Sequence, residues 1–201
     1  MPQLTRERPD LTAAAEAACR CLLSLWNGSL PVEPAVLLRA LPGVELLEWQ
    51  QASFLLRESG HDPMALPAAF GGRVSAIKLE GERYGRPVTD IVLLPGLMPT
   101  ERHFALAHEL GHILLKHECE SQAADREANC FASQLLLPRA AALLLLPKGR
   151  LLPGDLPRLA RRFLVEPGLI RQAEREGWQY PRAFSDELTR LFARSCAEGP
   201  T

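Results

Sequence analysis

The sequence predicts a mixed α+β fold, because three short strand-like stretches come before two long helical ones. The strands are predicted at residues 44–49, 72–79 and 88–94, and the helices at residues 104–116 and 124–137, where apolar side chains recur at helical spacing. With 201 residues, of which 47% are apolar and 23% charged, the chain can bury the core of one domain, or of one domain with a small appendage.

Two further helices are predicted before the first strand. Residues 11–26 form an amphipathic pattern that ends at the Asn-Gly pair 27–28, and residues 34–41 form a shorter pattern that ends before the Pro-Gly pair 42–43. Gly and Pro end helices, since Gly readily adopts left-handed conformations and Pro lacks an N–H group. We therefore expect two separate helices in this part of the chain.

The strands 72–79 and 88–94 are predicted to form a hairpin. Residues 80–87 between them are rich in turn formers and include Gly81 and Gly85. The second strand then leads through Pro and Gly residues into the first of the two long helices.

The helix 104–116 carries the pattern H-E-x-x-H at residues 108–112. His108 and His112 are one helical turn apart on the same face, so their ring nitrogens can converge on one ion. Zinc binds neutral imidazole well, and a catalytic zinc site keeps one position for water, whose pKa falls to roughly 7. Glu109 would then be the general base. The alternative is a pair of buried histidines without a metal, and the carboxylate between them makes a ligand pair the better interpretation.

The helix 124–137 is predicted to supply a third ligand, and two carboxylates compete for this role. Asp125 shares a face with the small and apolar residues that should pack on the first helix, whereas Glu127 lies about 200° away around the axis. We expect Asp125 to face the metal and Glu127 to be a solvated charge. Asn129, one turn after Asp125, is predicted to support a ligand through a hydrogen bond.

Two blocks of sequence are specific when they are taken together. The first is Glu-Arg-x-Phe-x-Leu-Ala-His-Glu-Leu-Gly-His at residues 101–112. The second combines Asp-x-Glu-Ala-Asn-x-Phe-Ala at residues 125–132 with Leu-Leu-Leu-Pro at residues 135–138. With both blocks, the chain resembles the ImmA/IrrE family of zinc metallopeptidases.

This resemblance implies a zinc site formed by both motif histidines and the carboxylate four residues before Asn129, which is Asp125. The family usually has Glu there, and because Asp is one methylene shorter, Glu127 stays open as the alternative ligand. The resemblance also implies a regulatory protease that cleaves a helix-turn-helix transcriptional repressor and so switches on stress or mobile-element genes. We expect the substrate to dock along the strand Ile91–Leu94, because an edge strand beside the metal can pair with an extended peptide.

The predicted organisation is a zincin-like metallopeptidase domain at residues 1–146, with N-terminal helices, a small sheet and the HExxH helix, and a C-terminal helical segment at residues 147–201. In this segment residues 155–163 and 168–176 are predicted to form two helices with helix-turn-helix-like spacing. Residues 139–182 hold nine basic and four acidic side chains. Two of the acidic ones lie on the second helix, where they would repel DNA phosphates, so a packing pair of helices is favoured and direct nucleic-acid binding is not expected.

Composition argues for a cytoplasmic protein. The net charge of −1 gives no overall attraction to nucleic acid or anionic membranes. The five cysteines lack zinc-finger and C-x-x-C spacing, which favours reduced thiols over a disulfide framework. No signal peptide fits the polar N-terminus, and the apolar run at residues 140–146 is too short for a membrane span of about 20 residues.

Five other residues near the motif are candidates for supporting roles. Tyr84, Tyr180 and His117 could stabilise the oxyanion of a tetrahedral intermediate. Arg102 lies at the positive end of the helix dipole and therefore needs a carboxylate partner. His103 is off the ligand face, and we expect it at the surface or behind a ligand.

Two functions from other classes remain alternatives. The first is a DNA-binding transcriptional regulator that uses residues 155–176. The second is a metal-binding interaction module without catalysis, which the intact Glu109 disfavours.

Overall fold

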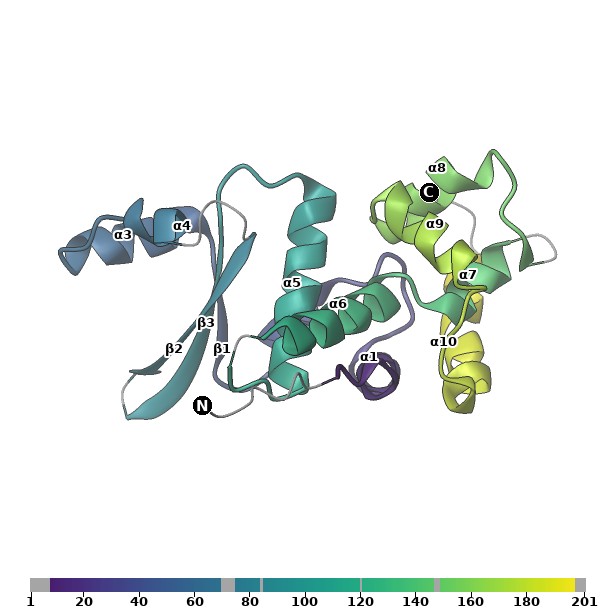
Figure 1. Ribbon diagram of the computed structural model, residues 1–201, viewed down its shortest axis with the longest axis horizontal. Coiled ribbons are helices and arrows are strands. Elements are labelled where there is room, and N and C mark those ends of the chain that lie inside the picture. The colour runs from purple at the N-terminus through teal and green to yellow at the C-terminus, as the bar shows by residue number, and fades with distance from the viewer. Residues whose placement is uncertain (1–7, 70–74, 84, 120, 147–148, 198–201) are drawn as a thin grey trace, which may run out of the picture.

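The computed structural model describes residues 8–69, 75–83, 85–119, 121–146 and 149–197, and it has the predicted mixed α+β class (Figure 1). The strands are β1 (Val44–Leu47), β2 (Ala76–Arg83) and β3 (Arg86–Leu93). The helices are α1 (Leu11–Leu25), α2 (Pro34–Arg39), α3 (Trp49–Glu58), α4 (Ala65–Ala69), α5 (Pro99–Leu114), α6 (Gln122–Leu136), α7 (Arg139–Leu145), α8 (Asp155–Phe163), α9 (Pro167–Arg175) and α10 (Ser185–Ala197). The sequence patterns above do not predict α3, α4, α7 or α10.

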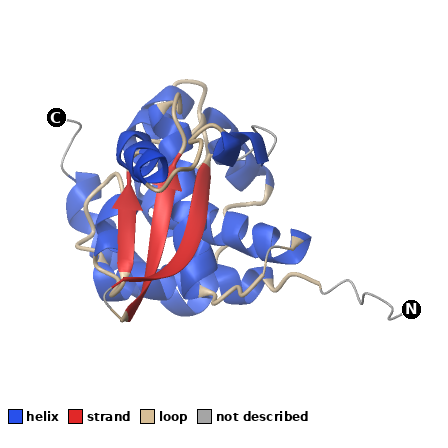
Figure 2. Ribbon diagram, turned by 90° about the vertical axis from the view of Figure 1, so that its left-hand side faces the viewer, coloured by secondary structure: helices blue, strands red, loops and turns tan. Residues whose placement is uncertain are grey.

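The three strands form one sheet in the order β1-β3-β2, which is drawn in red in Figure 2. Strands β2 and β3 pair antiparallel, so the predicted hairpin is confirmed. The predicted turn at residues 80–87 is too long, because β2 continues to Arg83 and β3 begins at Arg86. Gly85 has a φ of 73°, a left-handed conformation that Gly adopts without strain, which permits so tight a reversal. The predicted start of the first strand at residues 72–74 lies outside the described residues.

Strand β3 occupies the middle of the sheet. Its residue Ile91 is paired with Leu46 of β1 on one side and with Lys78 of β2 on the other. The prediction that a peptide pairs with Ile91–Leu94 is therefore wrong, since both edges of β3 are already hydrogen-bonded. The strand at the sheet edge that contacts α5 is β2.

Helix α5 stands between the sheet and α6, and α6 packs in turn on α1 (Figure 1). The two long helices approach most closely at Gly111. A Cβ atom at this position would lie 3.1 Å from Cδ1 of Phe131 and 3.2 Å from Cα of Ala128. The glycine inside the H-E-x-x-H pattern therefore lets α6 come close enough to bring its polar residues to the histidines.

Helices α7 to α10 lie on the side of α6 away from the sheet (Figure 1). Phe163 and Phe192 are fully buried there, in the same cluster of buried residues as Leu135 of α6. Gly28, after α1, has a φ of 83°, and a Cβ atom on it would lie 2.1 Å from the carbonyl oxygen of Leu191 in α10. The segment after α1 is thus packed against α10, and a division into residues 1–146 and 147–201 stays a prediction.

The stretch Gln122–Leu145, which contains α6 and α7, is long and apolar enough in composition to cross a membrane. However, 67% of its most apolar window is buried inside the protein. Packing in the core accounts for this composition.

Candidate metal centre

Contacts at the first turn of α5 fix the helix that carries the motif. Pro99 occupies the first helical turn, where its missing N–H costs no hydrogen bond, and Glu101 accepts a hydrogen bond from the N–H of Met98 at 2.9 Å. Both terminal nitrogens of Arg102 donate to the carboxylate of Glu48 at the start of α3. Glu48 is thus the partner expected for Arg102, and these charge-assisted hydrogen bonds lower the pKa of Glu48.

Three predicted ligands come together where α5 meets α6. The Nε2 atoms of His108 and His112 are 3.0 Å apart, and Oδ1 of Asp125 is 3.7 Å from Nε2 of His112. One ligand atom from each residue lies within 4.8 Å of the other two. Two imidazoles and one carboxylate in this arrangement fit the three-ligand set of a catalytic metal ion. Glu109, between the histidines in sequence, lines the cavities on both sides of the site.

Burial keeps the two histidines neutral. It lowers the pKa of His112 to about 4, with a smaller contribution from the neighbouring His108, and it also lowers the pKa of His108. At neutral pH each ring therefore has one nitrogen with a free electron pair, which a metal ion requires.

Asn129 of α6 orients His108. Its Oδ1 lies 3.0 Å from Nδ1 of His108, so Nδ1 carries the proton and donates it to the amide oxygen. Nε2 is then the basic nitrogen of His108, and it points towards His112. This contact agrees with the hydrogen bond predicted from the position of Asn129 one turn after Asp125.

His117 reaches the site because α5 ends in a left-handed turn. Lys116 has a φ of 58°, and after it the N–H of His117 bonds to the carbonyl of His112 at 3.0 Å. This is the Schellman arrangement of a helix C-terminus, in which the chain folds back over the last turn. The reversal brings Nδ1 of His117 to 2.9 Å from Nδ1 of His112.

On its Nδ1 side, His112 begins a series of hydrogen bonds that runs through His117 to Glu127. If Nε2 of His112 binds a metal, its Nδ1 must carry the proton and donate it to Nδ1 of His117. His117 then carries its own proton on Nε2, which lies 2.9 Å from Oε2 of Glu127. The other oxygen of Glu127 accepts the N–H of Asp10 at 2.7 Å. Each hydrogen-bond donor in this series of contacts therefore faces an acceptor.

These contacts separate the two carboxylates that the sequence left as alternatives. Both oxygens of Glu127 are engaged by His117 and Asp10, and its side chain is only 21% exposed. The expectation of a solvated charge at Glu127 is therefore wrong. Asp125, which is 53% exposed, is the carboxylate that lies beside both motif histidines.

The structure describes the surroundings of two of the other candidates, His103 and Tyr180. His103 is only 5% exposed, so the expectation of a surface position is wrong, and burial lowers its pKa to about 4. The hydroxyl of Tyr180 is hydrogen-bonded to Ser185 at 2.8 Å. Tyr84 lies outside the described residues.

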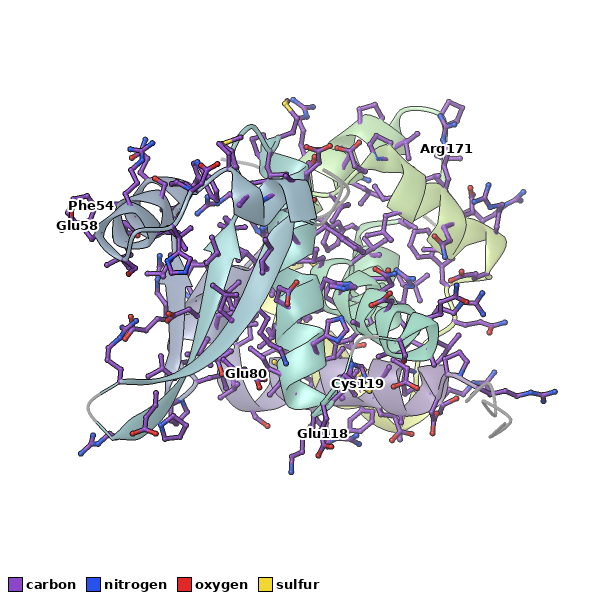
Figure 3. All side chains as sticks on the ribbon, turned by 60° about the vertical axis from the view of Figure 1, so that its left-hand side comes forward. Phe54, Glu58, Glu80, Glu118, Cys119 and Arg171 are labelled. Atoms are coloured by element: carbon purple, nitrogen blue, oxygen red, sulfur yellow. The ribbon has the colours of Figure 1, made fainter. Side chains whose placement is uncertain are left out.

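A cavity of about 400 Å³ runs along the exposed side of the site. Strand β2 forms one wall, and the segment after α5 forms another. Figure 3 shows Glu80 of β2 and, beyond the end of α5, Glu118 and Cys119, all of which line this cavity. The ligand group therefore faces a surface that an extended chain can reach.

The arrangement fits a metal-binding site, and a comparison with protein families points to a metallopeptidase. Residues 71–173 match the IrrE N-terminal-like domain, Peptidase_M78. The chain belongs to this family, which confirms the resemblance to ImmA/IrrE proteins and indicates a metallopeptidase with a protein substrate. No curated protein and no solved structure gave a match.

Proposed function

We propose that the chain is a zinc-dependent endopeptidase in which His108, His112 and Asp125 hold the ion. The observation that carries the proposal is the convergence of the three ligand atoms, with the outer nitrogen of each histidine already engaged by Asn129 or His117. Two neutral imidazoles and a carboxylate suit zinc. A zinc ion in this place supplies a Lewis acid for the scissile carbonyl and makes the attacking water more acidic.

Glu109 acts as the general base in this proposal. It takes a proton from the attacking water and returns it to the leaving amine. Its place beside His108, on the walls of both cavities at the site, supports this role, because a peptide that occupies them would lie within its reach. The alternative of a metal-binding module without catalysis gives no reason for a carboxylate there.

The substrate is proposed to bind along β2 rather than β3, in a zincin-like arrangement. Ala76, Lys78 and Glu80 of β2 line the cavity that also contains His108 and His112. In the described part of the sheet, β2 pairs only with β3. An extended peptide can therefore pair with its other edge through main-chain hydrogen bonds, which tolerate many sequences.

The proposed target is a helix-turn-helix repressor, and the proposed location is the cytoplasm. Both proposals rest on the family and on composition. All five cysteines are free, in keeping with a reducing compartment. A regulatory protease of this kind would cut one exposed or unfolding segment of its target.

The contacts of α8 disfavour a DNA-binding role for this helix. Arg158 donates to Asp155 and to the carbonyl of Leu145, and Arg162 donates to the carbonyl of Ser195. These basic side chains are therefore committed to contacts within the chain.

Co-expression with a helix-turn-helix repressor encoded nearby tests the target. The wild-type chain is expected to produce two repressor fragments, seen by mass spectrometry, whereas Glu109→Gln is expected to leave the repressor whole. If the wild-type chain also leaves it whole and instead retards operator DNA, the regulator alternative is correct.

Elemental analysis of purified variants tests the metal site separately. The wild-type chain and Glu109→Gln are expected to hold about one zinc per chain. Asp125→Ala should lose the metal, and Glu127→Ala should keep it when zinc is in excess. Zinc that survives the combined change His108→Ala and His112→Ala would refute the ligand assignment.

A further inference from the structure

A second cavity adjoins the metal centre on the side of the C-terminal helices. It has a volume of about 510 Å³, and His108 and Glu109 form part of its wall. The role proposed for Glu109 does not say which part of a substrate fills it. We call it the α9 pocket and define it by the apolar residues that line it, which are Ala76, Phe104, Ala105, Leu136, Val165 and Leu169.

The apolar walls of the α9 pocket are held in place by the core. Ala105, Leu136 and Val165 are 7%, 1% and 3% exposed. At the rim the hydroxyl of Thr100 donates to the carboxylate of Glu166, which joins the first turn of α5 to the start of α9. A cavity that packing has already formed binds an apolar group without a cost for ordering its walls.

The charges around the α9 pocket select against acidic groups. Glu101, Glu109 and Glu166 line it, and among the described residues no Lys or Arg does. A carboxylate that entered would lose water and meet like charges. An apolar side chain would instead bury its surface, which strengthens binding roughly fourfold for each methylene.

We infer that the α9 pocket receives a bulky apolar side chain of the substrate, from a residue next to the scissile bond. The inference rests on the proposed function, because the bond to be cut must lie at Glu109 and the metal ligands. The residues on either side of that bond are the ones close enough to fill a cavity that begins at His108 and Glu109. Leu169 of α9 and Val165, which lies between α8 and α9, thereby give the C-terminal helical segment a part in specificity.

Peptide hydroxamates bound to the zinc-loaded protein test this inference without any cleavage. In the first series one varied side chain lies on one side of the metal-binding group, and in the second series it lies on the other side. Calorimetry measures the Kd value of each compound. In one series isobutyl and benzyl compounds should bind at least tenfold tighter than the methyl compound, and the carboxymethyl compound should bind weakest. If all side chains within each series bind with equal affinity while zinc is retained, this inference is wrong and the proposed function still stands.

Substitutions in α9 locate the effect. Leu169→Trp should fill the pocket and remove the tenfold preference, while Arg171→Trp should keep it, because Arg171 is exposed on the outer side of α9 (Figure 3). If Leu169→Trp does not fold, Leu169→Ala should enlarge the pocket and shift the preference from isobutyl towards benzyl. A preference that no change at Leu169 alters would place the apolar site elsewhere. A chain that holds no zinc, or binds no hydroxamate, would refute the proposed function and this inference with it.

Discussion

The orientation of His112 depends on residues that do not themselves reach the metal position. His117 and Glu127 hold its Nδ1 side, as Asn129 holds that of His108. A ring held in this way keeps one tautomer and one direction, so less order has to be created when the ion binds.

We predict that His117→Phe weakens zinc binding about 10- to 100-fold, because the ring shape stays while the acceptor for His112 is lost. Competition with a chromophoric chelator measures the affinity. His61→Phe, at an exposed position outside the site, is the control and should bind zinc like the wild type. Unchanged affinity in His117→Phe would mean that the hydrogen bond does not position His112.

His103 should make the stability of the metal-free protein depend on pH. Burial lowers its pKa to about 4, against 6.5 for an unperturbed ring. The unfolded chain therefore binds this proton more readily, so the contribution of the neutral ring is complete above about pH 6.5 and is lost as the pH falls towards 4. At most about 3.5 kcal/mol of the free energy of unfolding is involved, since one pKa unit corresponds to about 1.4 kcal/mol.

Urea unfolding of the metal-free protein at pH 7 and pH 4.5 measures this contribution. The wild type should lose about 2 kcal/mol more than His103→Asn over this interval. The other buried histidines are present in both proteins and cancel in the comparison. Equal losses would show that His103 does not titrate in this range.

At the scale of elements, the contact between α5 and α6 sets the distance between the ligands. Gly111→Val should destabilise the protein by about 1–3 kcal/mol, because the new side chain meets the backbone of Ala128 and the ring of Phe131. It should also weaken zinc binding, since Asp125 moves with α6. The control is Gly168→Val in α9, where nothing lies within 4 Å of the added Cβ atom, and its stability should change little. Urea unfolding measures the change in stability, and a zinc titration measures the change in zinc affinity.

The sequence predicted the elements that carry the ligands, because their signals are local. Apolar spacing and the H-E-x-x-H pattern located α5 and α6, and the predicted residues 155–163 coincide with α8. The central position of β3 could not be predicted in this way, since it depends on parallel pairing with β1, which is distant in sequence. The contact of His117 with His112 was also inaccessible, because it requires Lys116 to adopt a left-handed conformation that its residue type does not signal.

At the scale of the whole molecule, the C-terminal helices share a core with the part that carries the metal ligands. Phe192 of α10 is fully buried in that core, and α10 packs on α7 and α1. Phe192→Ala should therefore lower the free energy of unfolding by about 3–5 kcal/mol. Tryptophan fluorescence and zinc release, followed in the same urea titration, should change together. A fluorescence change that comes well before zinc release would instead support independent units at residues 1–146 and 147–201.

The bond from Asp10 to Glu127 links the N-terminal cap of α1 to the metal centre through three side chains. The amide proton of Asp10 can therefore serve as a spectroscopic reporter of a site in a distant part of the sequence. When zinc draws electron density from His112, the polarisation passes through His117 to Glu127 and changes the strength of the bond to Asp10. The nitrogen-15 and proton resonances of this amide should shift during a zinc titration, whereas in His117→Phe they should not follow the metal.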